Sequence, residues 1–220
     1  MKFSDRTLTI LKSFSTINKS IQMKPGNVLR TVTPEKTLIA IAKIPDEIPS
    51  EACIYDLSRF LSIHGLYSDP DVEFHEKNFT ISEGRQKTKY VFADVSMIHA
   101  APEKEINIPS NDVEIDVSWE DMQSVLKAAG VLQFNEIAFV GEEGKCYLRA
   151  IDRANKNADA FGVEIGETDA EFTIIIKSEN LKLLPQDYKV TLCAKGISKF
   201  EGEDVTYFIG IDTESTYKKG

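Results

Sequence analysis

Lysine and arginine side chains gather at the start of this 220-residue chain, although the whole chain has a formal net charge of −9. Residues 1–30 hold six basic side chains against one acid, Asp5: they are Lys2, Arg6, Lys12, Lys19, Lys24 and Arg30. Basic groups release counterions when they bind nucleic-acid phosphates, whereas an acidic surface repels phosphates. The start of the chain is therefore a candidate phosphate-binding surface.

Charge is also sorted along the rest of the chain. Residues 177–199 hold five lysines against two acids, whereas residues 103–121 hold seven acids against one lysine. We expect charge that is sorted along the sequence to be sorted in space as well.

Motifs for nucleotide chemistry are absent from the sequence. GEEGK (141–145) differs from a P-loop in its glycine spacing and is followed by Cys146 where Ser or Thr is required, so we expect a hairpin turn. No GxGxxG, GxSxG or SxxK pattern occurs. The sequence therefore predicts neither a cofactor nor an enzymatic activity.

Histidine and cysteine residues are also too dispersed to predict a metal site. His64, His75 and His99 lack the spacing of zinc ligands, and the three cysteines are in no CxxC pair, which predicts buried free thiols at Cys53, Cys146 and Cys193. An enzyme with a site of dispersed Asp and His side chains, such as a metal-dependent hydrolase, stays open as an alternative.

The basic residues at the start lie in SDRTLTILKSFSTINKSI (4–21), which has the pattern of an amphipathic helix. Ser4 is a suitable N-cap, and the apolar positions follow at spacings of three and four: Leu8, Leu11, Phe14, Ile17 and Ile21. Lys12 and Lys19 are seven residues apart and would share the polar face with Thr9 and Thr16. This pattern fits either an ordinary solvated face or a phosphate-binding stripe.

The remainder of the first half predicts a β-rich unit with a second helix. Strands are expected at 28–32 and 37–44, the second bounded by Pro34 and Pro45. The stretch 52–68 predicts a helix that buries Leu57, Phe60, Leu61 and His64 and exposes Arg59. The alternating segments DVEFHE, NFTISE and TKYVFAD then predict strands.

The second half repeats this order after an acidic, proline-containing stretch. Ser118 and Asp121 predict the start of a helix that exposes Lys127, and strands are expected in EIAFVG, KCYLRAID, FGVEIG and EFTIIIK, with turns at GEEG and NKNAD (155–159). A short helix at 178–185 exposing Lys182 precedes the strands YKVTLCA, ISKFEG and DVTYFIGID. Two copies of one α/β unit, with four basic helices in all, are predicted.

Three stretches of the chain resemble the sliding clamp, or DNA polymerase processivity factor, of myovirus-type tailed phages. They are TLTILKSFSTIN (7–18), IYDLSRFLSIHGLYSD (54–69) and DYKVTLCAKGISKFEGEDVTYFIGIDTEST (187–216), about a quarter of the chain. The resemblance implies an α+β DNA-clamp fold with helices on an inner face and antiparallel sheets outside. The expected layout is a first unit at 1–100, a connector at 101–117 and a second unit at 118–220.

The resemblance also implies partners and site residues. Three chains would form a ring around duplex DNA, bound without sequence preference, and the ring would bind a phage DNA polymerase, a clamp loader and late-transcription factors. The residues expected to face DNA are Arg6, Lys12, Lys19, Lys24, Arg59, Lys127, Lys177 and Lys182. Ile106 and Ile108 would either line a pocket for polymerase peptides or attach the connector to a sheet.

An acidic total charge is compatible with that function. At physiological salt the Debye length is about 8 Å, so acids on an outer surface barely cancel lysines inside a hole. No apolar run approaches the roughly 18 residues of a membrane span, and the start lacks the pattern of a signal peptide, so we expect a location in the host cell cytoplasm. The alternative is a β-rich binding or assembly module that does not encircle DNA.

Overall fold

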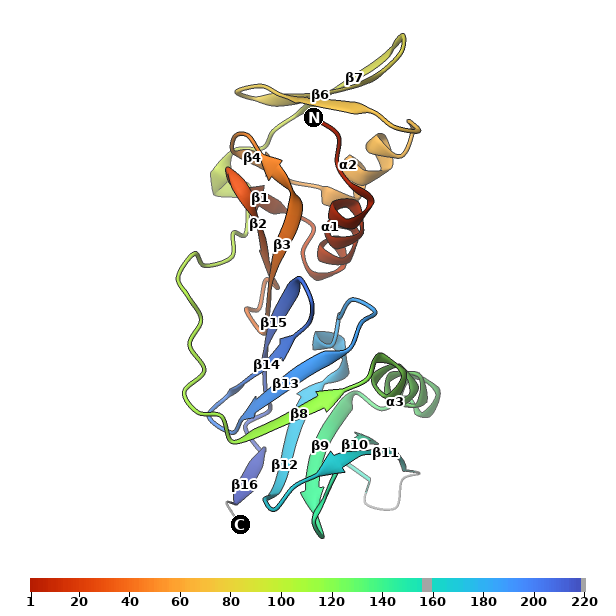
Figure 1. The fold of residues 1–220 in the computed structure, drawn as a ribbon, viewed down its shortest axis with the longest axis vertical. Coiled ribbons are helices and arrows are strands. Elements are labelled where there is room, and N and C mark those ends of the chain that lie inside the picture. The colour runs from red at the N-terminus through yellow and green to blue at the C-terminus, as the bar shows by residue number, and fades with distance from the viewer. Residues whose placement is uncertain (156–159, 219–220) are drawn as a thin grey trace. The chain divides into compact units, whose positions relative to one another are not determined.

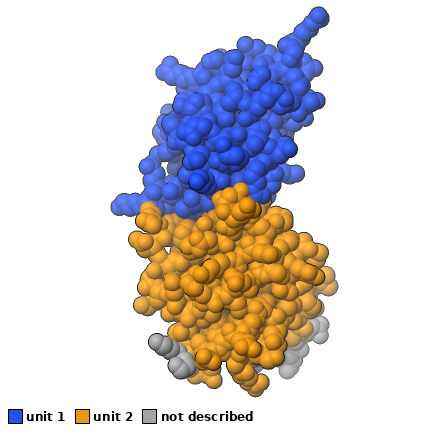
Figure 2. Space-filling model, viewed as in Figure 1, with its two compact units in different colours: residues 1–104 blue, residues 105–220 orange. Residues whose placement is uncertain are grey.

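The chain folds into two compact units, residues 1–104 and residues 105–220 (Figure 2). The computed structural model describes residues 1–155 and 160–218. Most of the turn expected at NKNAD, residues 156–159, lies outside the described residues.

Unit 1 contains two helices and three groups of antiparallel strands (Figure 1). In chain order its elements are α1 (Asp5–Ile17), β1 (Ile21–Met23), β2 (Gly26–Val32), β3 (Leu38–Ile48), β4 (Ala52–Ile54), α2 (Leu57–His64), β5 (Asp71–Phe74), β6 (Asn78–Glu83), β7 (Gln86–Val91) and the 3-10 turn η1 (Val95–Met97). β1 pairs with β4, β2 pairs with β3, and β5, β6 and β7 form a three-stranded sheet in that order.

Helix α1 begins where the sequence predicts but ends four residues earlier than expected. The Ser4 side chain accepts a hydrogen bond from Thr7 N at 3.2 Å, as an N-cap does. Asn18 ends the helix in an extended conformation because its Nδ2 donates to the carbonyl oxygen of Val32 at 2.9 Å. Ile21 consequently lies in β1, opposite Ile54, and Lys19 is not on the helix, which corrects the predicted Lys12–Lys19 stripe.

Two further boundaries in unit 1 differ from the prediction. Residues 52–54 form strand β4, and α2 starts after Asp56, whose carboxylate caps it by accepting from Arg59 N at 2.8 Å. Strand β3 continues past Pro45 to Ile48, whereas the sequence predicted an end near that proline. A proline is tolerated there because Pro45 is exposed, at a part of the strand where a missing N–H costs little.

The core of unit 1 is aromatic where α2 meets the sheet. The Phe60 ring lies 5.2 Å from that of Phe79 on β6 and 5.6 Å from that of Tyr90 on β7, between ring centroids. Helix α1 packs against β3 and α2 and buries Ile10, Leu11, Phe14 and Ile17. Both helices therefore cover the apolar faces of strands.

Unit 2 has one helix and two antiparallel sheets. Its elements are β8 (Val113–Val117), α3 (Trp119–Leu132), β9 (Glu136–Glu142), β10 (Lys145–Ile151), β11 (Phe161–Glu167), β12 (Glu171–Lys177), the 3-10 turn η2 (Ser178–Asn180), β13 (Tyr188–Cys193), β14 (Ile197–Glu201), β15 (Val205–Gly210) and β16 (Thr216–Lys218). One sheet has the order β11-β10-β9-β12-β16, and in the other β13 lies between β8 and β14, which pairs with β15. Of the range expected to be the connector, residues 113–117 thus form a strand.

Local signals predicted the first part of unit 2 well. Ser118 caps α3 by accepting from Asp121 N at 3.1 Å, and the buried face holds Met122, Val125 and Ala129. The GEEG segment is the expected hairpin turn, with Glu143 and Gly144 both at positive φ, 52° and 81°.

The helix predicted at 178–185 is wrong. It is a 3-10 turn of three residues, Ser178–Asn180, followed by irregular backbone. Tertiary hydrogen bonds replace helical ones at Leu184, whose N–H donates to the Tyr207 hydroxyl and whose carbonyl accepts from the Tyr188 hydroxyl. The described chain therefore contains three α-helices instead of four, and Lys182 is not on a helix.

Candidate nucleic-acid interface

A groove of about 680 Å³ runs between α1 and α2 in unit 1. It is lined by two kinds of side chain, apolar ones and polar ones: Leu8 and Leu61 on one hand, and Asp5, Thr9, Lys12, Ser15, Ser58, Ser62 and His64 on the other. The helices place these side chains on the face that points away from the buried residues of α1. The groove is therefore a polar surface supported by an apolar core.

Three of the predicted DNA-facing residues lie at this pair of helices. Lys12 on α1 and Arg59 on α2 are exposed. Lys19 is exposed beyond the end of α1, but its carbonyl oxygen accepts a hydrogen bond from Leu57 N at 2.7 Å, which holds Lys19 beside the first turn of α2. Arg6, in the first turns of α1, is half-buried. Tertiary structure thus brings together cations that the helical pattern alone did not connect.

Lys24 has a different environment from Lys12. It lies between β1 and β2, where its ammonium pairs with the carboxylate of Glu103. This hydrogen bond raises the pKa of Lys24 and lowers the pKa of Glu103. Arg30 Nη1 also reaches the carbonyl oxygen of Pro102, at 3.4 Å, so two basic residues of unit 1 hold the start of the connector.

The predicted residues of unit 2 lie around α3 and the end of β12. Lys127 is exposed on α3, and its Nζ donates to Gln123 one turn earlier at 2.9 Å. Lys177 is exposed at the end of β12, opposite Glu136 in the register of β9, and Lys182 is half-buried after η2. These lysines are therefore on a helix, a strand end and a loop, not on two matching helices.

Sequence reasoning missed the hydroxyl groups of the groove. Ser58 and Ser62, four residues apart on α2, face it together with Thr9 and Ser15 of α1. The spacing of four between Ser58 and Ser62 was the available signal, because residues at i and i+4 share a helix face.

Ile106 and Ile108, expected in a pocket for partner peptides or as anchors of the connector, are both half-buried. A separate hollow of about 210 Å³ lies beside the start of the connector, with Pro25, Val28, Ala100 and Ala101 in its wall.

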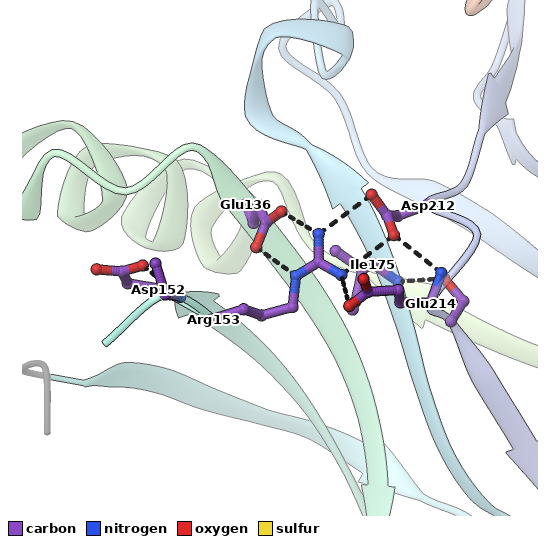
Figure 3. Close-up of polar contacts among 8 residues, drawn as sticks. Glu136, Asp152, Arg153, Ile175, Asp212 and Glu214 are labelled. Atoms are coloured by element: carbon purple, nitrogen blue, oxygen red, sulfur yellow. Dashed lines mark hydrogen bonds and ion pairs between the residues drawn. The ribbon is translucent and has the colours of Figure 1, made fainter. Parts of the chain in front are cut away.

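A charge cluster in unit 2 joins strands to the end of the chain (Figure 3). The guanidinium of Arg153 pairs with the carboxylates of Glu136, Asp212 and Glu214. Hydrogen bonds to Glu136 and Asp212 raise the pKa of Arg153, and the pKa of Asp212 is lowered by the Glu214 N–H first and by Arg153 second. With its acids already paired, this cluster is suited to holding structure together.

The histidines and cysteines have structural surroundings. His64 is nine-tenths buried beside Phe3 and Phe60, and burial lowers its pKa. All three cysteines are buried free thiols, as predicted, and burial raises the pKa of Cys146 to about 11. Across residues 1–155 and 160–218, no group of three or more His, Cys, Asp and Glu side chains is arranged to hold a metal ion. The described helices are also too short or too polar to cross a membrane.

Two family models match the chain, one in each unit. Residues 3–100 match the model described as "DNA polymerase processivity factor", and residues 114–213 match "gp45 sliding clamp, C terminal".

Curated relatives match over nearly the full length. The chain is 34% identical to the protein named "Sliding clamp" of Vibrio phage KVP40, over 96% of this chain and 99% of that protein. It is also 34% identical to the "Sliding clamp" of Enterobacteria phage T4, over 99% of each chain.

Solved structures of other clamps share the fold at low sequence identity. PCNA from Thermococcus kodakaraensis aligns with a TM-score of 0.70 at 16% identity, over 96% of this chain and 99% of that one. The DNA polymerase III subunit beta from Pseudomonas aeruginosa aligns with a TM-score of 0.69 at 10% identity, over 97% of this chain and 65% of that one. The α+β DNA-clamp fold that the resemblance implied is thereby confirmed. The chain belongs to the sliding clamp family of DNA polymerase processivity factors.

Proposed function

We propose that three copies of this chain close into a ring around duplex DNA and that the ring tethers the replicative DNA polymerase of its phage to the template. The observation that carries the proposal is the pair of packed helices α1 and α2, which present Lys12, Arg59 and a row of hydroxyl groups over an apolar core. This surface belongs to a chain of the sliding clamp family.

The chemistry of this surface suits sliding. Lysine and arginine attract phosphates of any sequence through a screened field, and contacts to phosphate carry no sequence information. Few base contacts means that no position along the duplex is strongly preferred. The proposed DNA-facing set remains Arg6, Lys12, Lys19, Lys24, Arg59, Lys127, Lys177 and Lys182, with Lys24 the weakest member because Glu103 already neutralises it.

The contribution to replication is one of effective concentration. A polymerase that releases the template while still attached to a closed ring stays near it and rebinds before it diffuses away. Proteins of this family are accessory factors, and we propose that this chain likewise catalyses no reaction.

Further partners are part of the proposal. They are a clamp loader that opens the ring, late-transcription factors, and polymerase peptides that bind near Ile106 and Ile108 of the connector, all in the cytoplasm of the infected host cell. The half-burial of both isoleucines leaves apolar surface available for such a peptide.

Retention on DNA tests the ring directly. The clamp loaded by its clamp loader onto nicked circular duplex is expected to stay bound through gel filtration, and linearising the circle should release it through the free ends. Equal release from both forms would sink the proposal. In solution, three chains of 24.6 kDa give a particle of about 74 kDa. A strict monomer at every concentration would favour the non-encircling binding module instead.

A further inference from the structure

One strand in each unit lies at the open edge of a sheet. Within the described residues β7 pairs with β6 alone, and β11 pairs with β10 alone. The opposite edge of the unit 1 sheet is covered, because the Met1 amine donates to Val72 O at 2.9 Å and Val72 N donates back to Met1 O at 2.7 Å. An uncovered edge presents backbone N–H and C=O groups to a further strand. β7 and β11 are thus two candidate docking edges on one chain.

Cross-strand register shows which side chains of β7 face solvent. Tyr90 lies opposite Phe79 and is buried against α2, so Thr88 and Tyr90 point to the core. Lys87 and Lys89 alternate with them, are exposed, and lie on the other face of the sheet.

The same analysis applies to β11. Val163 lies opposite Leu148, which is fully buried, so it points to the core that α3 covers. Glu164 and Glu167 lie opposite Tyr147 and Lys145, on the outer face, and both are exposed. Each edge strand therefore carries a helix-covered core face and a charged outer face.

The two outer faces have opposite charge. β7 carries Lys87 and Lys89, with Arg85 exposed in the preceding turn. On β11, Glu164 and Glu167 share one cation, Lys145, which lies 2.7 Å from Glu164 and whose pKa both carboxylates raise. An acidic edge thus retains an unneutralised carboxylate that a basic edge can pair with. Opposite charges on neighbouring strands stabilise a sheet, whereas like charges destabilise it.

Large apolar side chains are exposed on the helix side of both edges. Leu66 is 73% exposed just after α2, next to Tyr67, whose hydroxyl is 2.6 Å from Thr88 on β7. Val131 is 82% exposed in the last turn of α3, the helix that packs on β11. Such exposure in a folded chain is typical of a surface that a partner covers.

We propose that β7 of one chain pairs with β11 of a second copy, so that the two sheets continue into one another. If the helices of both copies cover the same side of the joined sheet, Lys87 and Lys89 lie on the same outer face as Glu164 and Glu167, and Leu66 and Val131 lie together on the helix side. The contact is head-to-tail and uses different surfaces of the two chains, so a closing rotation generates a ring. This inference rests on the ring proposed above and assigns its seam.

Charge reversal tests the seam with a result that no general loss of stability imitates. A variant with Lys87→Glu and Lys89→Glu has two acidic edges, and one with Glu164→Lys and Glu167→Lys has two basic edges. Each is expected to dissociate at about a tenfold or higher concentration than the wild type, since two favourable pairs become repulsive. A chain that carries all four substitutions has exchanged edges and should regain the trimer mass.

A mixture of the two double variants sharpens the test. Its two kinds of chain alternate along complementary seams, so a ring of three cannot close, and sedimentation should show a two-chain species of about 49 kDa instead of about 74 kDa. The matched control, Lys43→Glu with Lys195→Glu, reverses two exposed lysines away from both edges and should leave the trimer unchanged.

The outcomes separate the seam from the ring. If the wild type is a trimer and the four-substitution chain is folded, by Trp119 fluorescence, but does not reassemble, the β7–β11 seam is wrong while the ring stands. If the wild type sediments as a monomer at all concentrations, the ring itself fails.

Discussion

Arg153 and Asp212 form a bidentate pair in which Nη1 and Nη2 of the guanidinium donate to Oδ1 and Oδ2 of the carboxylate, at 3.1 Å each (Figure 3). Glu136 on β9 binds the same guanidinium through Nε and Nη2. The end of β10 is thereby joined both to the start of β9 and to the segment that leads into β16. One side chain holds three parts of unit 2.

Replacing this guanidinium should destabilise unit 2. Arg153→Lys keeps the charge but loses the planar fork, so one ammonium cannot satisfy three carboxylates at once. The Arg153 side chain is 30% exposed, and we expect a loss of about 1–3 kcal/mol in the free energy of unfolding, the usual range for hydrogen bonds to charged groups. Urea unfolding followed by Trp119 fluorescence measures it.

The control for Arg153 is a pair that solvent screens. Lys189 lies 3.2 Å from Glu114 with both side chains about half exposed, so Lys189→Ala should cost little or nothing, as surface ion pairs do. Equal effects of Arg153→Lys and Lys189→Ala would contradict the proposed role of Arg153.

Charge reversal on the helix pair should weaken DNA binding. Lys12→Glu with Arg59→Glu replaces attraction by repulsion at α1 and α2, so a loaded clamp should leave circular DNA faster, and the difference should shrink as salt rises. Lys43→Glu is the matched control: Lys43 is exposed on β3, while its neighbours Ala42 and Ile44 are buried on the face that α1 covers. Indistinguishable lifetimes for the two variants would place the DNA surface elsewhere.

Lys24 and Lys12 should differ in their contribution to DNA binding. Glu103 already neutralises the ammonium of Lys24, so Lys24→Ala removes less positive field than Lys12→Ala removes. We therefore expect Lys12→Ala to shorten the lifetime on circular DNA more than Lys24→Ala does, at low salt. A larger effect of Lys24→Ala would show that its pair with Glu103 opens when DNA is bound.

Burial of His64 predicts a loss of stability at low pH. Its pKa is lowered from the ordinary value of 6.5, chiefly by desolvation, and its Nε2 has no hydrogen-bond partner among the described residues. The neutral ring is favoured in the fold, so this stabilisation is complete above about pH 6.5 and is lost as the pH falls through the lowered value.

A substituted chain isolates the contribution of His64 from that of other titrating groups. His64→Leu removes the titration while keeping an apolar side chain, so the difference in unfolding free energy between wild type and variant should change between pH 7.5 and pH 5, at one fixed protein concentration. A difference that is the same at both pH values would exclude this role.

The sequence alone determined the elements whose signals are local. Ser4 and Ser118 mark the starts of α1 and α3 because an N-cap bonds a residue three positions ahead in the same segment. Alternation of apolar and polar residues located β5, β6 and β7 and most strands of unit 2, because side chains of a strand point to opposite faces in turn. The excess of basic residues over acids at the start of the chain likewise indicated α1 as a candidate phosphate-binding helix.

Tertiary structure alone decided what depends on partners far along the chain. Asn18 ends α1 because it finds Val32, and Leu184 leaves the helical conformation because Tyr188 and Tyr207 satisfy its backbone groups. A hydrogen bond from Leu57 places Lys19 beside α2, and a connector carboxylate 79 residues away claims Lys24. Periodicity records only which face a residue occupies on its own element. The identity of the neighbour on that face is set by packing, and for each lysine that neighbour decides whether its charge remains available to DNA.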